Sequence, residues 1–478
     1  MSAPKNHVQF TLKVMINKDK TKVLFAEADS DFFDILLSFL TLPLGKIAKI
    51  VVDRYGDNTP LAVGSLTSLY NSLADLDVLH FHTETGKQML LNPRSVFDNE
   101  CCKLKLNLND SEPTKYFTCG RPKSRKHNFS MYYDTVGCDC GKTMSKETKF
   151  LSSEAAEDGN DDQAFCRKGA SFIISNDMRL ALTGSVLRTL AELGIRDTKG
   201  AEMRNVTFGY NEIIDLLQGM FVSRTPLTDV IIGKAQSNSR VLIPKTEETT
   251  VSNCEKKMIL NVMLQKSTQK LIFAQAKDDF VEFLFSLLTI PLGGALSLLG
   301  TNTGATSLDN FYTSVENING DEYLKTKDTK AKLRDTRLPI GYMSPNQLLP
   351  LTEGGYRELH YSRPSEYYRC NGYLSPSTIT YRRSRLLRYK SPKGNGNYVK
   401  GPTMYMVTDD LTVTPLCVTS SLSILDRLGI PLSDVRELEL NIGLEEVLSI
   451  LKASLTSTSA LTNGLFRPSP KKRVKQEH

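Results

Sequence analysis

The feature that most constrains the fold of this chain is an internal duplication. Residues 10–51 align without a gap onto residues 258–299 at a constant shift of 248 positions, and 17 of the 42 aligned residues are identical. Both copies contain the run Thr-x-Pro-Leu-Gly, at 41–45 and at 289–293. The correspondence resumes towards the end of each copy, where Gly194-Ile195 matches Gly429-Ile430. The chain is therefore predicted to contain two units of similar structure.

The length of the chain agrees with two units. A chain of 478 residues exceeds the size at which a single core stops growing. We expect a first repeat unit over residues 8–235, a polar linker over 236–256, a second repeat unit over 257–466, and a disordered basic tail over 467–478.

Each unit is predicted to have an α+β fold. Alternating apolar residues at the start of each copy predict an N-terminal β-hairpin. A run rich in Phe, Leu and Ile follows, and Pro43 and Pro291 interrupt it, so we expect a buried helix with a kink at the proline. The end of each unit has the pattern of strand, helix, strand and helix.

An acidic group precedes the buried helix in both copies. Asp31 and Asp34 are spaced like an N-cap and its third helical residue, and Asp279 and Glu282 repeat the spacing. We interpret these residues as helix caps rather than as ligands of a divalent metal, because the second copy has Lys277 where the first has Asp29.

The composition indicates an intracellular protein, cytoplasmic or nuclear and not secreted. The polar segment 1–13 lacks the hydrophobic region of a signal peptide, and the nine cysteines are unevenly spread. Residues 283–299 carry no charge, but their counterpart in the first copy contains Lys46 and Lys49. We therefore expect buried helices and no membrane span.

Several motifs resemble those of a known family. These are Val-Leu-Phe-Ala-Glu-Ala at 23–28, the Phe-x-x-x-Leu-x-Ser-x-Leu-Thr-x-Pro-Leu-Gly runs at 32–45 and 280–293, and Thr-Pro-Leu-Thr-Asp at 225–229. They resemble the plant family called domain of unknown function 674. The resemblance covers nearly the whole chain and implies an architecture but no established activity.

The same resemblance implies four cysteines in the middle of the first unit, as Tyr-Phe-x-Cys, a second cysteine shortly after, and Cys-x-Cys-Gly. Cys119, Cys138 and Cys140 match this pattern, whereas residues 120–124 contain no cysteine.

Three thiolates would bind zinc if a fourth ligand completed the set. The candidates for that fourth ligand are His127, Cys166, Cys101 and Cys102. The second copy keeps only Cys370, at the position of Cys119, so a zinc site here would not be essential to the fold of both units. The alternative is free cysteines in a reducing cell.

A second group of metal-ligating residue types is His80, His82 and Glu84. Their alternation would place all three on one face of a strand. The second copy has no such pair of histidines, so surface histidines without a catalytic or metal-binding role are the favoured interpretation.

The segment 361–400 contains nine Lys or Arg, seven Tyr and a single acidic residue, Glu366. Basic side chains can neutralise phosphates while tyrosines stack on bases, which is how single-stranded nucleic acids are bound. The candidate residues are Tyr381, Arg382, Arg383, Arg385, Arg388 and Tyr389. A solvated strand or loop with half-buried tyrosines is the favoured alternative.

The tail contains Lys471, Lys472 and Arg473 in a short basic patch that resembles a nuclear-import signal. The stretch 154–162 has five acidic residues in nine and is expected to be an insertion.

No known catalytic motif occurs, and no catalytic residue or small-molecule substrate can be assigned. The sequence therefore favours a non-enzymatic binding protein with a protein partner. The alternatives are a nucleic-acid-binding protein and an enzyme with an unfamiliar site between the repeats.

Overall fold

The computed structural model describes residues 7–56, 63–120, 127–148, 150–151, 163–182, 186–195, 197–233, 257–300, 302–326, 328–334, 337–354, 358–361, 368–370, 385–394 and 396–466. Helices and strands occur in mixed order along these residues, which confirms the predicted α+β class. The predicted linker and basic tail lie outside the described residues.

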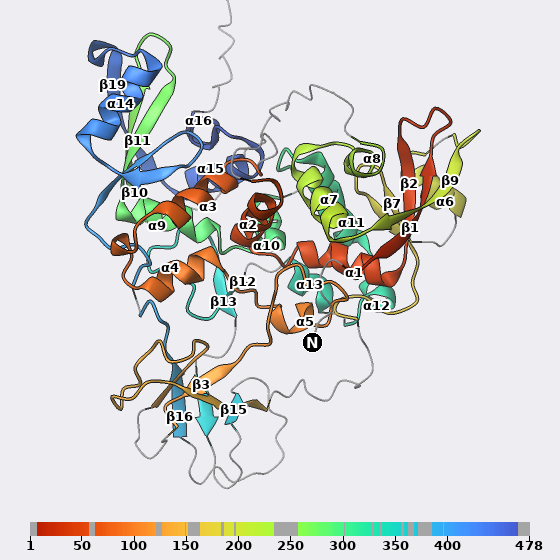
Figure 1. Cartoon of the computed structure of the whole chain (residues 1–478), viewed down its shortest axis with the longest axis horizontal. Coiled ribbons are helices and arrows are strands. Elements are labelled where there is room, and N and C mark those ends of the chain that lie inside the picture. The colour runs from red at the N-terminus through yellow and green to blue at the C-terminus, as the bar shows by residue number, and fades with distance from the viewer. Residues whose placement is uncertain are drawn as a thin grey trace, which may run out of the picture.

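Each copy contains a five-stranded antiparallel sheet, and the strand order is the same in both: β8-β7-β2-β1-β9 and β18-β17-β11-β10-β19. The first sheet comprises β1 (Phe10–Ile16), β2 (Val23–Ala28), β7 (Phe172–Ser175), β8 (Leu180–Leu182) and β9 (Glu202–Phe208). The second comprises β10 (Met258–Gln265), β11 (Leu271–Lys277), β17 (Met404–Val407), β18 (Val413–Pro415) and β19 (Val435–Ile442). The matching orders confirm the predicted duplication, and Figure 1 shows the two sheets at opposite ends of the molecule.

The predicted hairpin forms in both copies, because alternate residues of its first strand are apolar and face the core. The buried helix follows as two helices in each copy. These are α1 (Ser30–Phe39) and α2 (Leu44–Tyr55), and α9 (Asp278–Leu287) and α10 (Leu292–Leu299). Pro43 and Pro291 have extended backbones immediately before α2 and α10, so the predicted break at the proline is confirmed.

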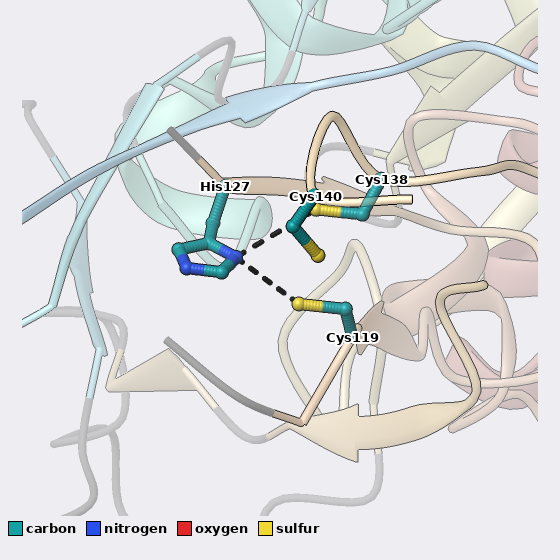
Figure 2. A group of neighbouring side chains, drawn as sticks. All are labelled: Cys119, His127, Cys138 and Cys140. Carbon is teal, nitrogen blue, oxygen red and sulfur yellow. Dashed lines mark hydrogen bonds between the residues drawn. The ribbon is translucent and has the colours of Figure 1, made fainter. Parts of the chain in front are cut away.

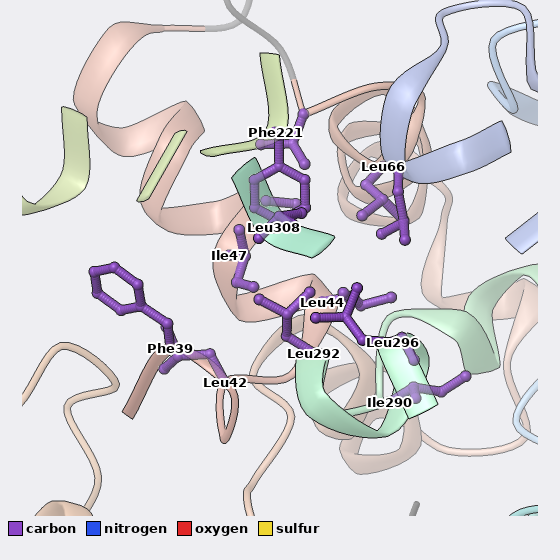
Figure 3. Packing of buried hydrophobic residues seen from close by; sticks show 14 of the residues in the cluster. Phe39, Leu42, Leu44, Ile47, Leu66, Phe221, Ile290, Leu292, Leu296 and Leu308 are labelled. Carbon is purple, nitrogen blue, oxygen red and sulfur yellow. The ribbon is translucent and has the colours of Figure 1, made fainter. Parts of the chain in front are cut away.

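The two proline turns contact each other at the centre of the molecule. The amide of Gly45 donates to the carbonyl of Leu288 at 2.7 Å, and the amide of Gly293 donates to the carbonyl of Leu40 at 2.7 Å. A second reciprocal pair lies beside the first. The amide of Leu44 donates to the carbonyl of Ile290 at 2.9 Å, and the amide of Leu292 donates to the carbonyl of Leu42 at 2.9 Å. The side chains around these bonds are fully buried (Figure 3). The run shared by the two copies is therefore the contact that joins them.

Beyond this contact, each copy packs its third helix against the other copy. Helix α3 (Leu66–Asp75) packs on α9 and β18, and α11 (Thr306–Asn317) packs on α7 (Tyr210–Val222) and β8. Two isolated β-bridges also join the copies: Phe81 of the first copy pairs with Val399 of the second, and Leu324 of the second pairs with Cys166 of the first. One large hydrophobic cluster consequently contains side chains of both copies.

The acidic residues do not cap the helices as predicted. The N-cap of α1 is Asp29, which accepts from the amide of Phe32 at 2.9 Å. Asp34 is 3% exposed and accepts from the amides of Ala164, Phe165 and Cys166. Its counterpart Glu282 is 2% exposed and accepts from the amides of Tyr398 and Val399. Burial raises the pKa of both carboxyl groups, which hold distant chain segments against the helix.

A third sheet combines strands of both copies. Its order is β5-β3-β4-β16-β14-β15-β6, and it appears below the rest of the molecule in Figure 1. The first copy supplies β3 (Tyr116–Thr118), β4 (His127–Ser130), β5 (Lys146–Thr148) and β6 (Phe150–Leu151). The second copy supplies β14 (Glu358–Tyr361), β15 (Tyr368–Cys370) and β16 (Arg385–Tyr389). The parallel pairs β4 with β16 and β6 with β15 join the two sets. We call this sheet and its connecting loops the composite lobe.

Shorter elements complete the units. In the sequence, the elements between the central helices and the strands of the composite lobe are short. In the first copy they are η2 (Val78–His80), α4 (Glu84–Leu91) and α5 (Asp98–Cys101), and in the second they are α12 (Gly320–Tyr323), α13 (Thr329–Leu333), β12 (Arg337–Pro339) and β13 (Thr352–Gly354). The C-terminal parts contain α6 (Val186–Glu192) and α8 (Pro226–Ile231), and α14 (Val418–Leu428), η3 (Leu432–Asp434), α15 (Leu444–Thr456) and α16 (Ala460–Leu465). The predicted order of strand, helix, strand and helix is confirmed in both copies.

The prediction that His80, His82 and Glu84 share a strand is wrong. His80 ends η2, and Glu84 begins α4, whose N-cap is Thr83. The backbone of this segment instead forms the bridge to the second copy: His82 donates to the carbonyl of Tyr398 at 2.9 Å, and Lys400 donates to the carbonyl of His80 at 2.8 Å. Among the residues that the structure describes, no helix combines the length and the hydrophobicity needed to cross a membrane.

The close packing of backbone around Gly293, by the end of α13 and by the other proline turn, leads to a stability prediction. An alanine Cβ at Gly293 would lie 1.9 Å from the carbonyl oxygen of Leu333 and 3.1 Å from that of Leu40. Gly293→Ala is expected to destabilise the protein by about 1–3 kcal/mol, although alanine is the better helix former. Urea unfolding measures the effect. Gly396→Ala is the matched control, since no atom lies within 4 Å of its added Cβ, and it should change stability by less than about 0.5 kcal/mol. Equal unfolding midpoints for the two variants would contradict the role assigned to Gly293.

Candidate metal centre

Four side chains of metal-ligating type come together at one end of the composite lobe. Cys119 follows β3, His127 opens the neighbouring strand β4, and Cys138 and Cys140 lie in a turn after β4. One ligand atom from each residue lies within 4.8 Å of the others. Figure 2 shows the four side chains directed towards one another. We call these four residues the Cys-His cluster. The structure thus brings the three predicted cysteines together with His127, one of the candidate fourth ligands.

The imidazole of His127 faces the sulfur atoms. Its Nδ1 atom lies 3.1 Å from the Sγ atom of Cys119 and 3.7 Å from the Sγ atom of Cys138. His127 and Cys138 are buried, Cys119 is half-buried, and Cys140 is exposed. One side of the cluster is therefore closed by protein, and the other side faces the solvent.

The backbone explains why two cysteines separated by one residue can face the same point. The amide of Cys138 donates to the carbonyl of Lys142 at 2.7 Å, and the amide of Gly141 donates to the carbonyl of Cys138 at 2.9 Å. Gly141 has a φ of +82°, in the left-handed region that glycine adopts without strain. The glycine of Cys-x-Cys-Gly thus lets the chain reverse directly after the second cysteine.

Contacts around the cluster connect it to both copies. The amide of Asp139 donates to the side-chain oxygen of Asn128 at 2.8 Å. The carboxylate of Asp139 accepts from the ammonium group of Lys390 at 3.0 Å, and the amide of Lys390 donates to the carbonyl of Phe129 at 2.9 Å. Because Lys390 directly follows β16 of the second copy, the Cys-x-Cys turn lies at the joint between the two halves of the sheet.

The hydrophobic core beside the cluster is small. It contains Phe117, Val136, Met144 and Cys138, with Cys119 packed against it. A core of this size contributes little stability, and domains with small cores commonly require a disulfide or a metal ion.

The chemistry of the four donors suits zinc. Three sulfur ligands and one imidazole nitrogen form one of the usual sets for structural Zn²⁺. A hydrogen bond with the backbone of Lys142, and further ones with the thiols of Cys138 and Cys119, lower the pKa of the Cys140 thiol. The thiolate is the form of cysteine that binds metal, so this shift favours coordination.

The other cysteines considered as fourth ligands make contacts away from the cluster. Cys101 is buried, with its sulfur 3.5 Å from the hydroxyl of Thr41. Cys102 donates to the carbonyl of Ser111 at 3.1 Å, and Cys166 donates to the carbonyl of Ser30 at 3.2 Å. Burial raises the pKa of Cys101 and of Cys166.

The residues proposed for nucleic-acid binding are only partly described. Arg385, Arg388 and Tyr389 lie on β16, and Arg388 is exposed. The half-buried ring of Tyr389 makes a T-shaped contact with Phe129, with centroids 5.5 Å apart, and burial raises its pKa, so this tyrosine takes part in the packing of the lobe. Tyr381, Arg382 and Arg383 lie outside the described residues, as do Lys471, Lys472 and Arg473 of the tail and the acidic stretch 154–162.

Sequence reasoning missed the roles of Asp139, Lys390, Asp34 and Glu282. For Asp34 and Glu282 a signal was present, because an acidic residue occupies the same place within an apolar run in both copies. For Asp139 and Lys390 there was none, because their contact depends on the pairing of β4 with β16.

Thiol reactivity tests the exposure of the cluster. In native, metal-free protein, we expect iodoacetamide to modify Cys140 and Cys417 before Cys101 and Cys166. Cys140 and Cys417 are exposed, and the pKa of Cys417 is lowered by hydrogen bonds with the side chain and amide of Ser420. Added zinc should protect Cys140 and leave the rate at Cys417 unchanged, as peptide mass spectrometry would show. Equal effects of zinc on both cysteines would contradict metal binding at the cluster.

Comparison with known proteins identifies the family. The family described as "Protein of unknown function (DUF674)" matches residues 6–443, with a second match over residues 369–478. The second match over the C-terminal part agrees with a duplicated unit. No curated protein and no solved structure matches the chain. A duplicated α+β chain with the motifs described above, matched over most of its length, belongs to the DUF674 family.

Proposed function

We propose that this protein is a non-enzymatic, intracellular binding protein for a protein partner, and that structural zinc held by the Cys-His cluster stabilises its composite lobe. The observation that carries the zinc proposal is the convergence of four donor atoms within 4.8 Å from three separate places in the chain. All four ligands come from the protein, which is the arrangement of structural rather than catalytic zinc.

The position of the cluster explains what the metal would stabilise. It would fix the Cys-x-Cys turn to β3 and β4, and this turn carries Asp139, the partner of Lys390. Bound zinc would therefore support the joint between the strands of the two copies. Because the neighbouring core is small, the free energy of metal binding would be a large part of the stability of this region.

Exposed apolar side chains on α14 support a protein partner. Val418 is 76% exposed, Leu422 41% and Leu428 54%. Leu432, in the 3₁₀ helix that follows, is 67% exposed. Neighbouring apolar groups on a surface commonly mark protein interaction sites. The second copy thus offers an apolar helix surface that its own sheet does not cover.

Metal analysis tests the zinc proposal. Purified protein is expected to contain about one zinc per chain, because structural zinc sites hold one ion on four ligands. Cys138→Ser should lose the metal and become sensitive to protease in the composite lobe, since it removes a buried ligand. Cys417→Ser is the control and should keep both metal and resistance. Less than about a tenth of an equivalent of zinc in the unmodified protein would refute the proposal.

Affinity purification with and without nuclease tests the partner class. We expect a protein partner to remain bound after nuclease treatment and to be lost in the double variant Val418→Ser, Leu428→Ser, because exposed apolar contacts drive such binding. Lys270→Ser, at another exposed surface position, is the control and should retain the partner. Loss of binding on nuclease treatment, together with salt-dependent binding of single-stranded RNA or DNA by the purified protein, would favour the nucleic-acid alternative instead.

A further inference from the structure

We propose that a hollow between the two copies binds a small organic anion, namely a carboxylate or phosphate group carried on an apolar body. The hollow has a volume of about 370 Å³ and lies between α5 of the first copy and α13 of the second. This volume falls within the range of small-molecule sites, which begins at about 300 Å³. The site is separate from the Cys-His cluster and does not depend on zinc.

The apolar part of the hollow is held in a fixed position. Phe97 and Phe165 are 4% and 2% exposed and meet edge to face, with centroids 6.2 Å apart. The amide of Phe165 donates to the buried carboxylate of Asp34 at 2.9 Å, and its carbonyl accepts from the amide of Lys325 at 2.9 Å. Both copies therefore fix the position of Phe165, whose ring is buried behind the wall of the hollow.

The charged part of the hollow favours an anion. Basic residues outnumber acidic ones in its lining: there are three lysines, Lys103, Lys325 and Lys332, and two acidic residues, Glu100 and Asp328. The ammonium group of Lys325 donates to the carbonyl of Gln163 at 2.9 Å, which holds that side chain in place. Lys103 is exposed and Lys332 is half-buried. Ammonium groups beside a low-dielectric apolar wall attract a carboxylate or phosphate more strongly than they would in open water.

The corresponding place in the other half of the molecule is filled by the chain itself. His82 donates to Tyr398 there, as Lys325 donates to Phe165 here. Lys393, 6% exposed, places its ammonium group 4.3 Å from the ring centroid of Tyr398 and donates to the carbonyl of Met343 at 2.6 Å.

Gly86 of α4 makes room for this arrangement, because a Cβ there would lie 3.8 Å from the Cβ of Lys393 and 3.7 Å from the ring of Tyr398. The fold can thus close this place with its own side chains. Among the residues that the structure describes, the corresponding place in the first half is left open.

Titration of the full-length protein with phenyl phosphate, followed by calorimetry and by ligand-observed NMR, tests the proposal. We expect saturable binding that Lys332→Glu weakens at least tenfold and Lys103→Glu also weakens. Lys270→Glu, an equal change of charge on an exposed turn of the second sheet, should leave the affinity unchanged. Benzoate and inorganic phosphate serve as comparison probes: benzoate identifies whether the site prefers a carboxylate or a phosphate, and phosphate alone should bind more weakly because it lacks the apolar body.

Three results would overturn the proposal. These are no saturable binding below about 10 mM, equal weakening by Lys332→Glu and Lys270→Glu, or inorganic phosphate binding as tightly as phenyl phosphate. If Lys332→Glu fails to fold, as judged by circular dichroism, Lys103→Ala at the exposed rim replaces it, and unchanged affinity in Lys103→Ala would count against the site.

Discussion

The structure depends on a short antiparallel contact between two turns of identical sequence pattern. Backbone amides at Gly45 and Gly293 each donate to a carbonyl of the other copy at 2.7 Å, in the middle of a fully buried region. Buried backbone groups must be paired, so neither turn could be buried without the other. Glycine is required at Gly293 because another backbone carbonyl occupies the place of a side chain. The same residues that end one helix and begin the next thus hold the two halves together.

The two copies also contact each other away from the proline turns. Each copy places its third helix on the other copy, and each buried acid, Asp34 or Glu282, fixes the chain segment that receives the bridge from the opposite side. The composite lobe and the hollow are both built from residues of the two copies. The hollow therefore exists only because the repeats are intertwined, whereas all four residues of the Cys-His cluster come from the first copy.

The two copies have diverged most where the fold leaves them free. Three cysteines of the first copy belong to the Cys-His cluster, whereas the second copy keeps only Cys370, at the position of Cys119. Among the described residues, the place beside Phe165 is open, whereas its counterpart beside Tyr398 is filled by Lys393. Because of the duplication, each of these positions occurs in both copies. One copy can therefore acquire a ligand at such a position while the equivalent residues of the other copy only pack together.

The sequence alone determined the duplication, the hairpins and the helix breaks at Pro43 and Pro291, since these follow from local periodicity and from the geometry of proline. The resemblance of its motifs to a known family also indicated Cys119, Cys138 and Cys140. Only the tertiary structure decided that His127 joins them, that Asp34 and Glu282 bind distant amides instead of capping, and that lysines of both copies surround one hollow. These outcomes depend on contacts between residues more than 100 positions apart, or on how strands pair, and neither periodicity nor spacing carries that information.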